Sequence, residues 1–457
     1  MRKGDLMHRR VLLRAVGALL VLAAACTAGG GSNNESPAAT VNPSGSHAPV
    51  TLTAWVVFSN PEFGYFNTVI KSFEKKYPWI TVKTVPGKQD TDVLNAIHSG
   101  TAPDVAAIGV PDDGVEFCST DAYLNLEPYI KADNIDLAST VPAGALAYTA
   151  YADKHSQCML PMLTDAYGLY YNTALFKKAG ISSPPKTYSE LFADAKKLTQ
   201  FNADGSIKVA GFLPLATGDY ELANYVNGNS IGAQWYDNSG HSVLASDPRF
   251  AQMLTFIKSM TDWFGYDKLS RFFSGNGGEN TEFSSSNLFE KGKLAMVIDG
   301  EWRVGFIKND KSNVPYATAP FPVADSAAEL YGSGQTGGST IGIPAATKHP
   351  AEAWLLVKYL SLDTQGETML ARALHNVPTV FDALDDPVLA SDPHFSTFLK
   401  ITNHPQSHYK QITKLGFGDV SLYDAFVDTY LAGKVTDLKA GLQKVATQID
   451  NQLQLGG

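Results

Sequence analysis

The 457-residue chain has little cysteine and more acidic than basic side chains. Its three cysteines form no CxxC motif, and no HExxH or P-loop lysine motif occurs. Lysine and arginine total 36 against 45 aspartate and glutamate, and an acidic chain is a poor match for nucleic acid. We therefore expect no metal, no other cofactor and no nucleic-acid partner.

The N-terminal apolar run is short. Residues Ala15–Ala25 follow a basic stretch that begins at Arg2, and they number fewer than the roughly 20 that a membrane span needs. This pattern predicts a signal peptide over residues 1–25. The Leu-Ala-Ala-Ala stretch before Cys26 resembles a bacterial lipobox and favours lipidation of that cysteine, with an unlipidated secreted protein as the alternative. Residues 26–49 are rich in Gly, Ser, Asn, Pro and Ala, which predicts a flexible tether.

Cys118 and Cys158 remain once Cys26 is assigned to lipid. In an oxidising compartment a disulfide between them is the natural interpretation, and a metal site would need more ligands than two such thiols. Two free buried thiols are the alternative.

The first hundred residues after the tether alternate between strand and helix patterns. Strands are predicted over 51–58, 80–84 and 104–108, with helices over 66–77 and 92–98 between them. This order predicts an α/β fold with a largely parallel sheet, in which ligands sit beyond the carboxyl ends of the strands. Those ends lead into the polar loops 59–65 and 109–116.

The stretch Leu288–Val304 carries the most distinctive local pattern. It predicts a helix end at Gly292, a buried strand over 294–298 and a tight turn at 299–301 that presents Trp302. A large ring fixed by a rigid strand is suited to the floor of a ligand cleft, whereas burial of Trp302 in the core is the alternative.

Further elements are predicted along the rest of the chain. Residues 158–172 form strands that cross from one domain to another, and a capping box of Thr187 and Glu190 begins a helix over 186–199. Helices are also expected at 247–264, at 350–360 and twice within 421–455, and strands at 315–321 and 340–343.

Polar and aromatic residues cluster at the predicted strand ends. Carboxylates and amides bind vicinal hydroxyls, and aromatic faces cover the C–H faces of a sugar ring. The candidate ligand-binding residues are Asn60, Glu62, Tyr65, Asp112, Asp113, Asp165, Tyr220, Trp235, Glu301, Trp302, Gly338 and Arg372.

The sequence matches one nucleotide-binding motif and one catalytic motif, but neither match has the neighbouring strand and helix that the motif requires. Gly332, Gly334 and Gly337 form a G-x-G-x-x-G that is followed by a strand rather than a helix. Gly228–Gly232 matches G-x-S-x-G without a strand before it. The many carboxylates leave a glycosidase pair open, because spacing in sequence does not fix their separation.

Several stretches resemble the carbohydrate-type extracellular solute-binding proteins of ABC importers, the maltose-binding-protein-like class. The most specific are LPMLTDAYGLYYNTALFKKAGISSPPKTYSEL at 160–191 and FEKGKLAMVIDGEW at 289–302. SGTAPDV at 99–105 and GGSTIGIPAATKHPAEAWLLVKYL at 337–360 are weaker matches.

The resemblance implies a two-lobe periplasmic-binding-protein type II fold, each lobe a mostly parallel sheet flanked by helices around a ligand cleft. In such a fold we expect residues 50–162 and 300–345 to form the N-terminal lobe. Residues 163–299 and 346–457 would form the C-terminal lobe.

The family pattern also implies residue roles. Asp165 matches a sugar-binding carboxylate after the first crossing, and Trp302 and Tyr220 match stacking aromatics. Asp112 and Asp113, like Asn60 and Glu62, fall in loops that bind hydroxyls.

We therefore predict a non-enzymatic, monomeric substrate-binding component of an ABC importer. It would capture a mono- or oligosaccharide by hinged closure, deliver it to a membrane permease and be lipid-anchored outside the cell membrane. The alternatives are a binder of a polyol phosphate or polyamine, and a secreted glycoside-acting enzyme.

Overall fold

Two separate sheets organise the chain in the computed structural model, which describes residues 41, 45–150, 157–215, 228 and 232–455. The first sheet has the strand order β2-β1-β3-β11-β4. Its strands are β1 (Val50–Trp55), β2 (Ile80–Val85), β3 (Val105–Ile108), β4 (Met159–Pro161) and β11 (Thr340–Gly342). β1 is parallel to β2 and β3, while β11 is antiparallel to β3 and β4.

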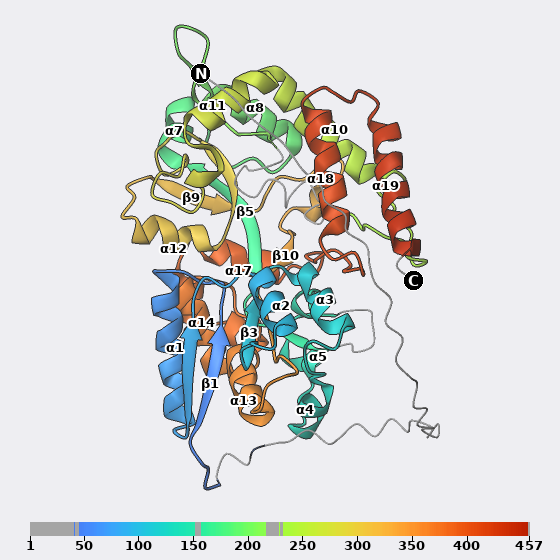
Figure 1. The fold of residues 1–457 in the computed structure, drawn as a ribbon. Coiled ribbons are helices and arrows are strands. Elements are labelled where there is room, and N and C mark those ends of the chain that lie inside the picture. The colour runs from blue at the N-terminus through green and yellow to red at the C-terminus, as the bar shows by residue number, and fades with distance from the viewer. Residues whose placement is uncertain (1–40, 42–44, 151–156, 216–227, 229–231, 456–457) are drawn as a thin grey trace, which may run out of the picture. The chain divides into compact units, whose positions relative to one another are not determined.

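Helices from two distant parts of the chain, residues 62–147 and 350–374, build the first lobe with this sheet. The helices of this lobe are α1 (Glu62–Lys76), α2 (Asp90–His98), η1 (Pro111–Asp113), α3 (Gly114–Ser119), α4 (Glu127–Ala132), α5 (Leu137–Thr140), α6 (Ala143–Ala147), α13 (Pro350–Ser361) and α14 (Thr364–Leu374). Figure 1 shows α1 and α14 side by side next to β1. On α1 the buried residues are Phe66, Val69, Ile70 and Phe73, the apolar stripe that its sequence predicts.

The second sheet is built around β5 (Asp165–Asn172), which pairs with β8 (Met296–Gly300), β9 (Tyr316–Ala319) and β10 (Thr336–Gly337). All three pairings are antiparallel. The two-lobe α/β architecture is therefore as expected, but the sheets are more mixed than predicted. The reason is that β8, β9 and β10 each run opposite to β5 instead of following a crossover helix.

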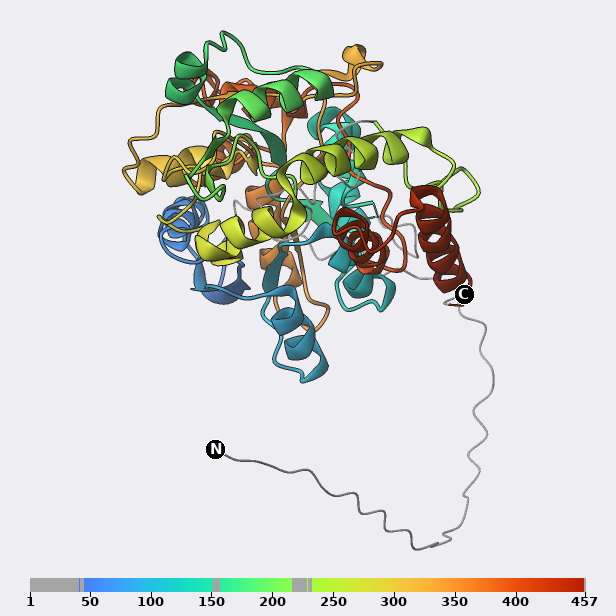
Figure 2. The same ribbon diagram turned by 90° about the horizontal axis from the view of Figure 1, so that it is seen from above.

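The second lobe is rich in helices. They are α7 (Thr173–Ala179), α8 (Tyr188–Leu198), α10 (Pro248–Phe264), α11 (Tyr266–Gly275), η3 (Gly278–Thr281), α12 (Trp302–Asn309), η4 (Ala328–Leu330), α16 (Pro387–Ser391), α17 (Ser396–Thr402), α18 (Gly418–Leu431) and α19 (Leu438–Leu455), with the small β6 (Gln200–Phe201) and β7 (Ile207–Val209) pair. Thr187 caps α8 by accepting from the Glu190 N–H, as predicted. The two C-terminal helices α18 and α19 pack on each other, as Figure 1 and Figure 2 show.

The chain passes between the lobes at residues 162–164, at 338–339 and again within 376–386, where α15 (Phe381–Leu384) lies. The first two crossings are hydrogen bonded to each other, because the Met162 N–H donates to the Ser339 carbonyl oxygen at 2.8 Å. The third is held to the first, because Thr164 and Val377 exchange backbone hydrogen bonds of 2.8 and 3.2 Å. The three crossings thus form one connected hinge region.

Two of the predicted lobe boundaries need correction. Residues 300–345 were placed in the N-terminal lobe, but β9 and β10 pair with β5 in the second sheet. Residues 346–457 were placed in the C-terminal lobe, but α13 and α14 bury their apolar faces in the core of the first. Each segment follows the sheet against which its apolar residues can be buried.

The segment Leu288–Val304 also differs in detail from its prediction. Residues 288–293 form turns rather than a helix, and Gly292 has the positive φ of 66° expected of a stop. The polar residues 299–301 are not a separate turn, because Asp299 and Gly300 end β8 and Glu301 immediately precedes α12. Arg303 on the first turn of α12 donates to Asp299 at 2.7 Å, which joins the helix to the strand.

Candidate functional site

Three polar side chains meet where β5, β8 and the third crossing come together. The Asn376 amide donates to Asp165 Oδ1 at 3.1 Å and to Glu301 Oε1 at 2.6 Å. The other oxygen of Glu301 accepts from the Ala166 N–H at 2.8 Å. Asn376 therefore fixes two carboxyl groups that belong to different elements.

The electrostatics of this cluster favour protonated carboxyl groups. Burial, together with the negative charge of Glu62, raises the pKa of Asp165 to about 7. Hydrogen bonds with Asn376 and Glu301 act in the opposite direction and lower this pKa, but burial outweighs them. Burial alone raises the pKa of Glu62 to about 7. Burial and then the charge of Asp165 raise the pKa of Glu301 well above its ordinary value. Glu62 lies on α1, so carboxyl groups of both lobes influence each other here.

An aromatic pair stands beside the carboxyl groups. The half-buried Trp302 ring packs edge to face against Tyr167, with ring centroids 5.6 Å apart and planes at 89°. Gly300 makes room for this ring, since a Cβ atom there would lie only 2.3 Å from Trp302. Phe283, which is 61% exposed, has its ring 6.5 Å from that of Trp302. The site therefore combines carboxyl groups with partly exposed aromatic surface.

The first strand–helix loop approaches from the other lobe. Asn60 is exposed and Tyr65 is 38% exposed. The Tyr65 hydroxyl donates to Asn309 at the end of α12, at 3.4 Å. Glu62 and Tyr65 thus face the second lobe from α1, as candidate ligand contacts should.

The two aspartates that follow β3, Asp112 and Asp113, lie in different environments. Asp112 is fully buried, and its two oxygens bond to the Lys410 amine and the Tyr409 hydroxyl. Both oxygens of Asp112 are therefore bonded to protein groups in this structure. Asp113 is half-buried, and burial together with the charges of Asp90, Asp112 and Glu116 raises its pKa to about 6.

Gly338 and Glu301 support the site without offering a free side chain. Gly338 has φ of +133°, and a Cβ atom there would lie 2.0 Å from the Leu163 carbonyl oxygen. Its glycine identity is therefore required by the close approach of two crossings. Glu301 is 0% exposed and holds Ala166 and Asn376, so we assign it a positioning role rather than the predicted ligand contact.

Two other predicted ligand residues lie apart from this cluster. Trp235 is 1% exposed and packs edge-on against Phe250 and Tyr423 in the core of the second lobe, so it has no free stacking face. Arg372 on α14 forms a two-point ion pair with Asp386. Tyr220 and Cys26 lie outside the described residues.

Cys118 and Cys158 form a disulfide, with their Cα atoms 5.8 Å apart, which confirms the predicted pairing. Both sulfurs are buried in the first lobe, where the bond joins α3 to the start of β4.

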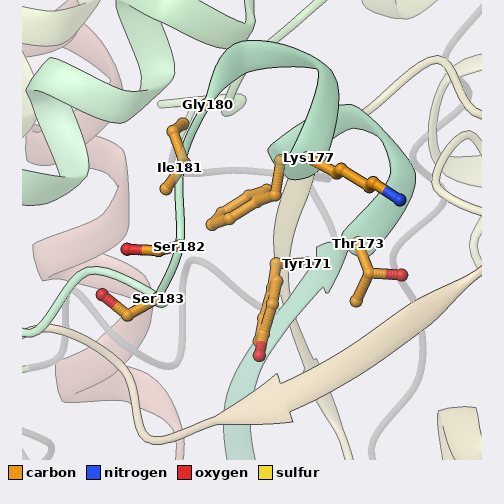
Figure 3. Close-up of a pocket in the computed structure, with 8 residues that line it drawn as sticks. Tyr171, Thr173, Lys177, Gly180, Ile181, Ser182 and Ser183 are labelled. Atoms are coloured by element: carbon orange, nitrogen blue, oxygen red, sulfur yellow. The ribbon is translucent and has the colours of Figure 1, made fainter.

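A surface pocket of about 430 Å³ lies on the second lobe around α7 and contains none of the predicted ligand residues. Its lining consists of Tyr171, Thr173, Phe176, Lys177, Gly180, Ile181, Ser182 and Ser183. Figure 3 shows the Lys177 amine directed away from Ser182 and Ser183, so the charged group does not converge with the hydroxyls. We therefore place the ligand site at the hinge cluster rather than in this pocket.

The described part of the chain holds no grouping of three or more His, Cys, Asp or Glu side chains fit to hold a metal ion. None of its helices combines the length and hydropathy that a membrane crossing requires.

Sequence reasoning missed Asn376, Tyr409 and Lys410. Asn376 follows His375, which adopts a left-handed conformation with φ of 57° after α14, and neither residue has a recognisable motif. Tyr409 and Lys410 lie in a loop far from their partner Asp112 in sequence. Only the folded chain brings Asn376 to the carboxyl cluster, and Tyr409 and Lys410 to Asp112.

The family model of bacterial extracellular solute-binding proteins matches residues 59–367. A maltooligosaccharide ABC transporter solute-binding lipoprotein of Streptococcus pneumoniae is 27% identical over 352 residues, which is 74% of each chain. An uncharacterized ABC transporter extracellular-binding protein of Pyrococcus horikoshii is 24% identical over 415 residues, covering 85% of this chain and 84% of that protein.

Solved structures share the fold. The protein CpMnBP1 with mannotriose bound has a TM-score of 0.74 and 24% identity, covering 87% of this chain and 99% of that one. The GacH receptor of Streptomyces glaucescens, solved unliganded and with acarbose, has a TM-score of 0.69 and 19% identity, covering 90% and 99%. With the family model matched over most of its length, the chain belongs to the bacterial extracellular solute-binding proteins.

Proposed function

We propose that this protein is the sugar-capturing component of an ABC importer. The observation that carries the proposal is the cluster of Asp165, Glu62 and Trp302 at the junction of the two lobes. Carboxyl groups whose pKa lies near 7 can accept from or donate to sugar hydroxyls, and a partly exposed indole can cover the C–H surface of a ring. Such a site desolvates a neutral polyol without leaving polar groups unpaired.

The names of related proteins support a neutral oligosaccharide as the ligand. The pneumococcal relative is named for maltooligosaccharides, and CpMnBP1 was solved with mannotriose. A phosphate-bearing ligand would favour arginine in the site. Two arginines considered for such a role are already paired with carboxylates, Arg303 with Asp299 and Arg372 with Asp386.

The mechanism we propose is closure of two lobes on the sugar. Glu62 and Tyr65 come from the first lobe, whereas Asp165 and Trp302 belong to the second. A ligand that contacts both sets at once binds the closed arrangement more tightly and so shifts the population toward it. The closed form then presents a face to the membrane permease.

No bond is broken in this proposal. A glycoside-acting enzyme needs two carboxyl groups on either side of the scissile bond. Glu301 is fully buried and tied to Ala166 and Asn376, so it cannot flank a sugar bound at Asp165. We further propose that residues 1–25 direct export and that lipid on Cys26 holds the protein at the outer face of the membrane.

Thermal unfolding of the mature protein against a ligand panel tests this function. The panel holds neutral oligosaccharides, sugar phosphates and polyamines at equal concentration. A ligand at about a hundred times its Kd stabilises the fold by about 2.7 kcal/mol, which raises Tm measurably. A shift with neutral saccharides supports the proposal, whereas a shift only with phosphates or amines contradicts it.

A further inference from the structure

The loop between α17 and α18 reaches both lobes of the protein. We call residues 403–417 the strap. Ile412 of the strap is 3% exposed and belongs to the core of the first lobe, while Leu415 packs against the core of the second. Figure 1 shows this red segment between α17 and α18, near β10. The strap is therefore a non-covalent connection in addition to the three crossings.

A buried lysine of the strap stands between carboxylates of the two lobes. Lys410 Nζ bonds to Asp112 of η1, in the first lobe, and lies 3.2 Å from Asp419 of α18, in the second. The side chain of Lys410 is 2% exposed, and those of Asp112 and Asp419 are 0% exposed. Three charges this well shielded from water interact strongly and depend on one another.

Tyrosine hydroxyls complete this network. Tyr409 donates to the second oxygen of Asp112, and Tyr236 donates to Asp419. The Tyr409 ring packs edge-on against Tyr148 of the first lobe, with centroids 6.2 Å apart. The carboxylates are thus satisfied by protein groups, which distinguishes this network from the sugar site at Asp165.

We propose that Asp112, Lys410 and Asp419 form an interlobe latch that stabilises the arrangement of the lobes seen here. Because α17 and α18, which flank the strap, both lie in the second lobe, separation of the lobes parts Lys410 from Asp112 and not from Asp419. The other carboxylate stays with it, so the lysine is never left unpaired and the latch can open reversibly. The strength of the latch then sets how often the lobes separate, and hence how readily a bound molecule escapes.

A distance measurement between the lobes tests the latch. Fluorophores are attached through non-cysteine chemistry at two exposed positions, Lys71 on α1 and Ser259 on α10, and energy transfer is recorded without added sugar. The ratio of molecules with separated lobes to molecules in the arrangement seen here is read from the distance distribution. In Lys410→Met this ratio should rise about tenfold or more. Asp112→Asn, which keeps the side-chain shape, should shift the same ratio in the same direction.

The matched control is Lys358→Met. Lys358 pairs with Asp133 at 2.5 Å, but both residues lie in the first lobe. Its loss should leave the distance distribution unchanged, while circular dichroism confirms that each variant is folded.

The proposal is overturned if both Asp112→Asn and a folded Lys410→Met keep the wild-type distribution. It is also overturned if Lys358→Met shifts the distribution as much as they do. Should Lys410→Met fail to fold, Tyr409→Phe takes its place beside Asp112→Asn and must shift the ratio the same way. Because no sugar is used, these outcomes are independent of whether the sugar proposal holds.

Discussion

At the scale of single residues, Trp302 and Asp165 are held by opposite means. Trp302 lies against the bare backbone of Gly300 and the edge of Tyr167, so its position comes from packing. Asp165 is oriented by a hydrogen bond from Asn376, and the negative charge of Glu62 raises its pKa. We expect the first to supply stacking energy and the second to supply directional hydrogen bonds.

Trp302→Ala should weaken sugar binding by more than about 1 kcal/mol, roughly the energy of one aromatic stacking contact. The measurement is a calorimetric titration of the variant and the wild type with the best sugar of the panel. Trp263→Ala is the matched control, because Trp263 is 39% exposed on α10 and packs against Phe192 and Phe201 away from the site. Equal losses in both variants would refute a specific role for Trp302.

The carboxyl cluster predicts a pH dependence of stability. The folded-state pKa values of Asp165 and Glu62, about 7, lie above the values of ordinary exposed carboxyl groups. The folded state therefore binds more protons than the unfolded state between about pH 4 and 7, and these groups make the free energy of unfolding fall as pH rises through that window.

Asp165→Asn should flatten this decline, which chemical denaturation at pH 5 and pH 8 would measure. Asp204→Asn is the control, because Asp204 is exposed in the hairpin turn and its pKa is lowered by hydrogen bonds from Ser206. A wild-type slope in Asp165→Asn would show that the pKa of this carboxyl is not raised in the folded protein.

At the scale of elements, β8 and α12 present the site as one rigid unit. The strand ends at Gly300, Glu301 is buried beneath the junction, and α12 begins with Trp302 itself. The Arg303–Asp299 ion pair and the bond from the Tyr170 hydroxyl to the Gly300 carbonyl, 2.8 Å, hold strand and helix together. The junction therefore fixes Trp302 from both sides.

Gly338→Ala should disrupt the junction of the first two crossings. The new Cβ would meet the Leu163 carbonyl oxygen at 2.0 Å, and φ of +133° is unfavourable for alanine. We expect a loss of about 2 kcal/mol or more in the free energy of unfolding, measured by denaturant titration.

Gly275→Ala is its control, because a Cβ there meets nothing within 4 Å and φ is not positive. If Gly338→Ala is as stable as Gly275→Ala, the crossings are not in the tight contact described.

The sequence predicted individual elements better than their partners. The apolar stripe of α1 and the Thr187 cap of α8 are local patterns, and both were identified correctly. The sheet to which β9 belongs and the core that receives α13 depend on long-range burial, and these were misplaced. Sequence patterns also could not predict that Asp112 bonds to Lys410, which lies almost 300 positions later in the chain.

At the scale of the whole molecule, the two lobes are joined by three crossings and a strap, and each has a core cluster of its own. The largest cluster of buried residues belongs to the first lobe and a second cluster to the second lobe. A third cluster lies mostly in the second lobe but includes Ala371 of α14 and Val377 of the third crossing. Stability within each lobe can therefore be changed without touching the junction where the sugar is proposed to bind.

The disulfide should stabilise the first lobe alone. Cys118 and Cys158 are 40 residues apart, and closing such a loop contributes about 4 kcal/mol in the chain-entropy model. The double variant Cys118→Ser, Cys158→Ser should lose up to about that much in the free energy of unfolding, measured by denaturant titration. Reductant should destabilise the wild type but leave the double variant unchanged, and equal effects on both would contradict the assignment.

The most direct test of the central claim is a calorimetric titration of the mature protein with neutral oligosaccharides, mannotriose and a maltooligosaccharide among them, with chromatography of the sugar afterwards. We predict saturable binding of one sugar per protein and full recovery of the sugar unchanged. Shortened sugar would mean that the protein is an enzyme. Binding heat seen only with phosphorylated or cationic ligands would mean that the cluster of carboxyl and aromatic groups does not recognise neutral sugars.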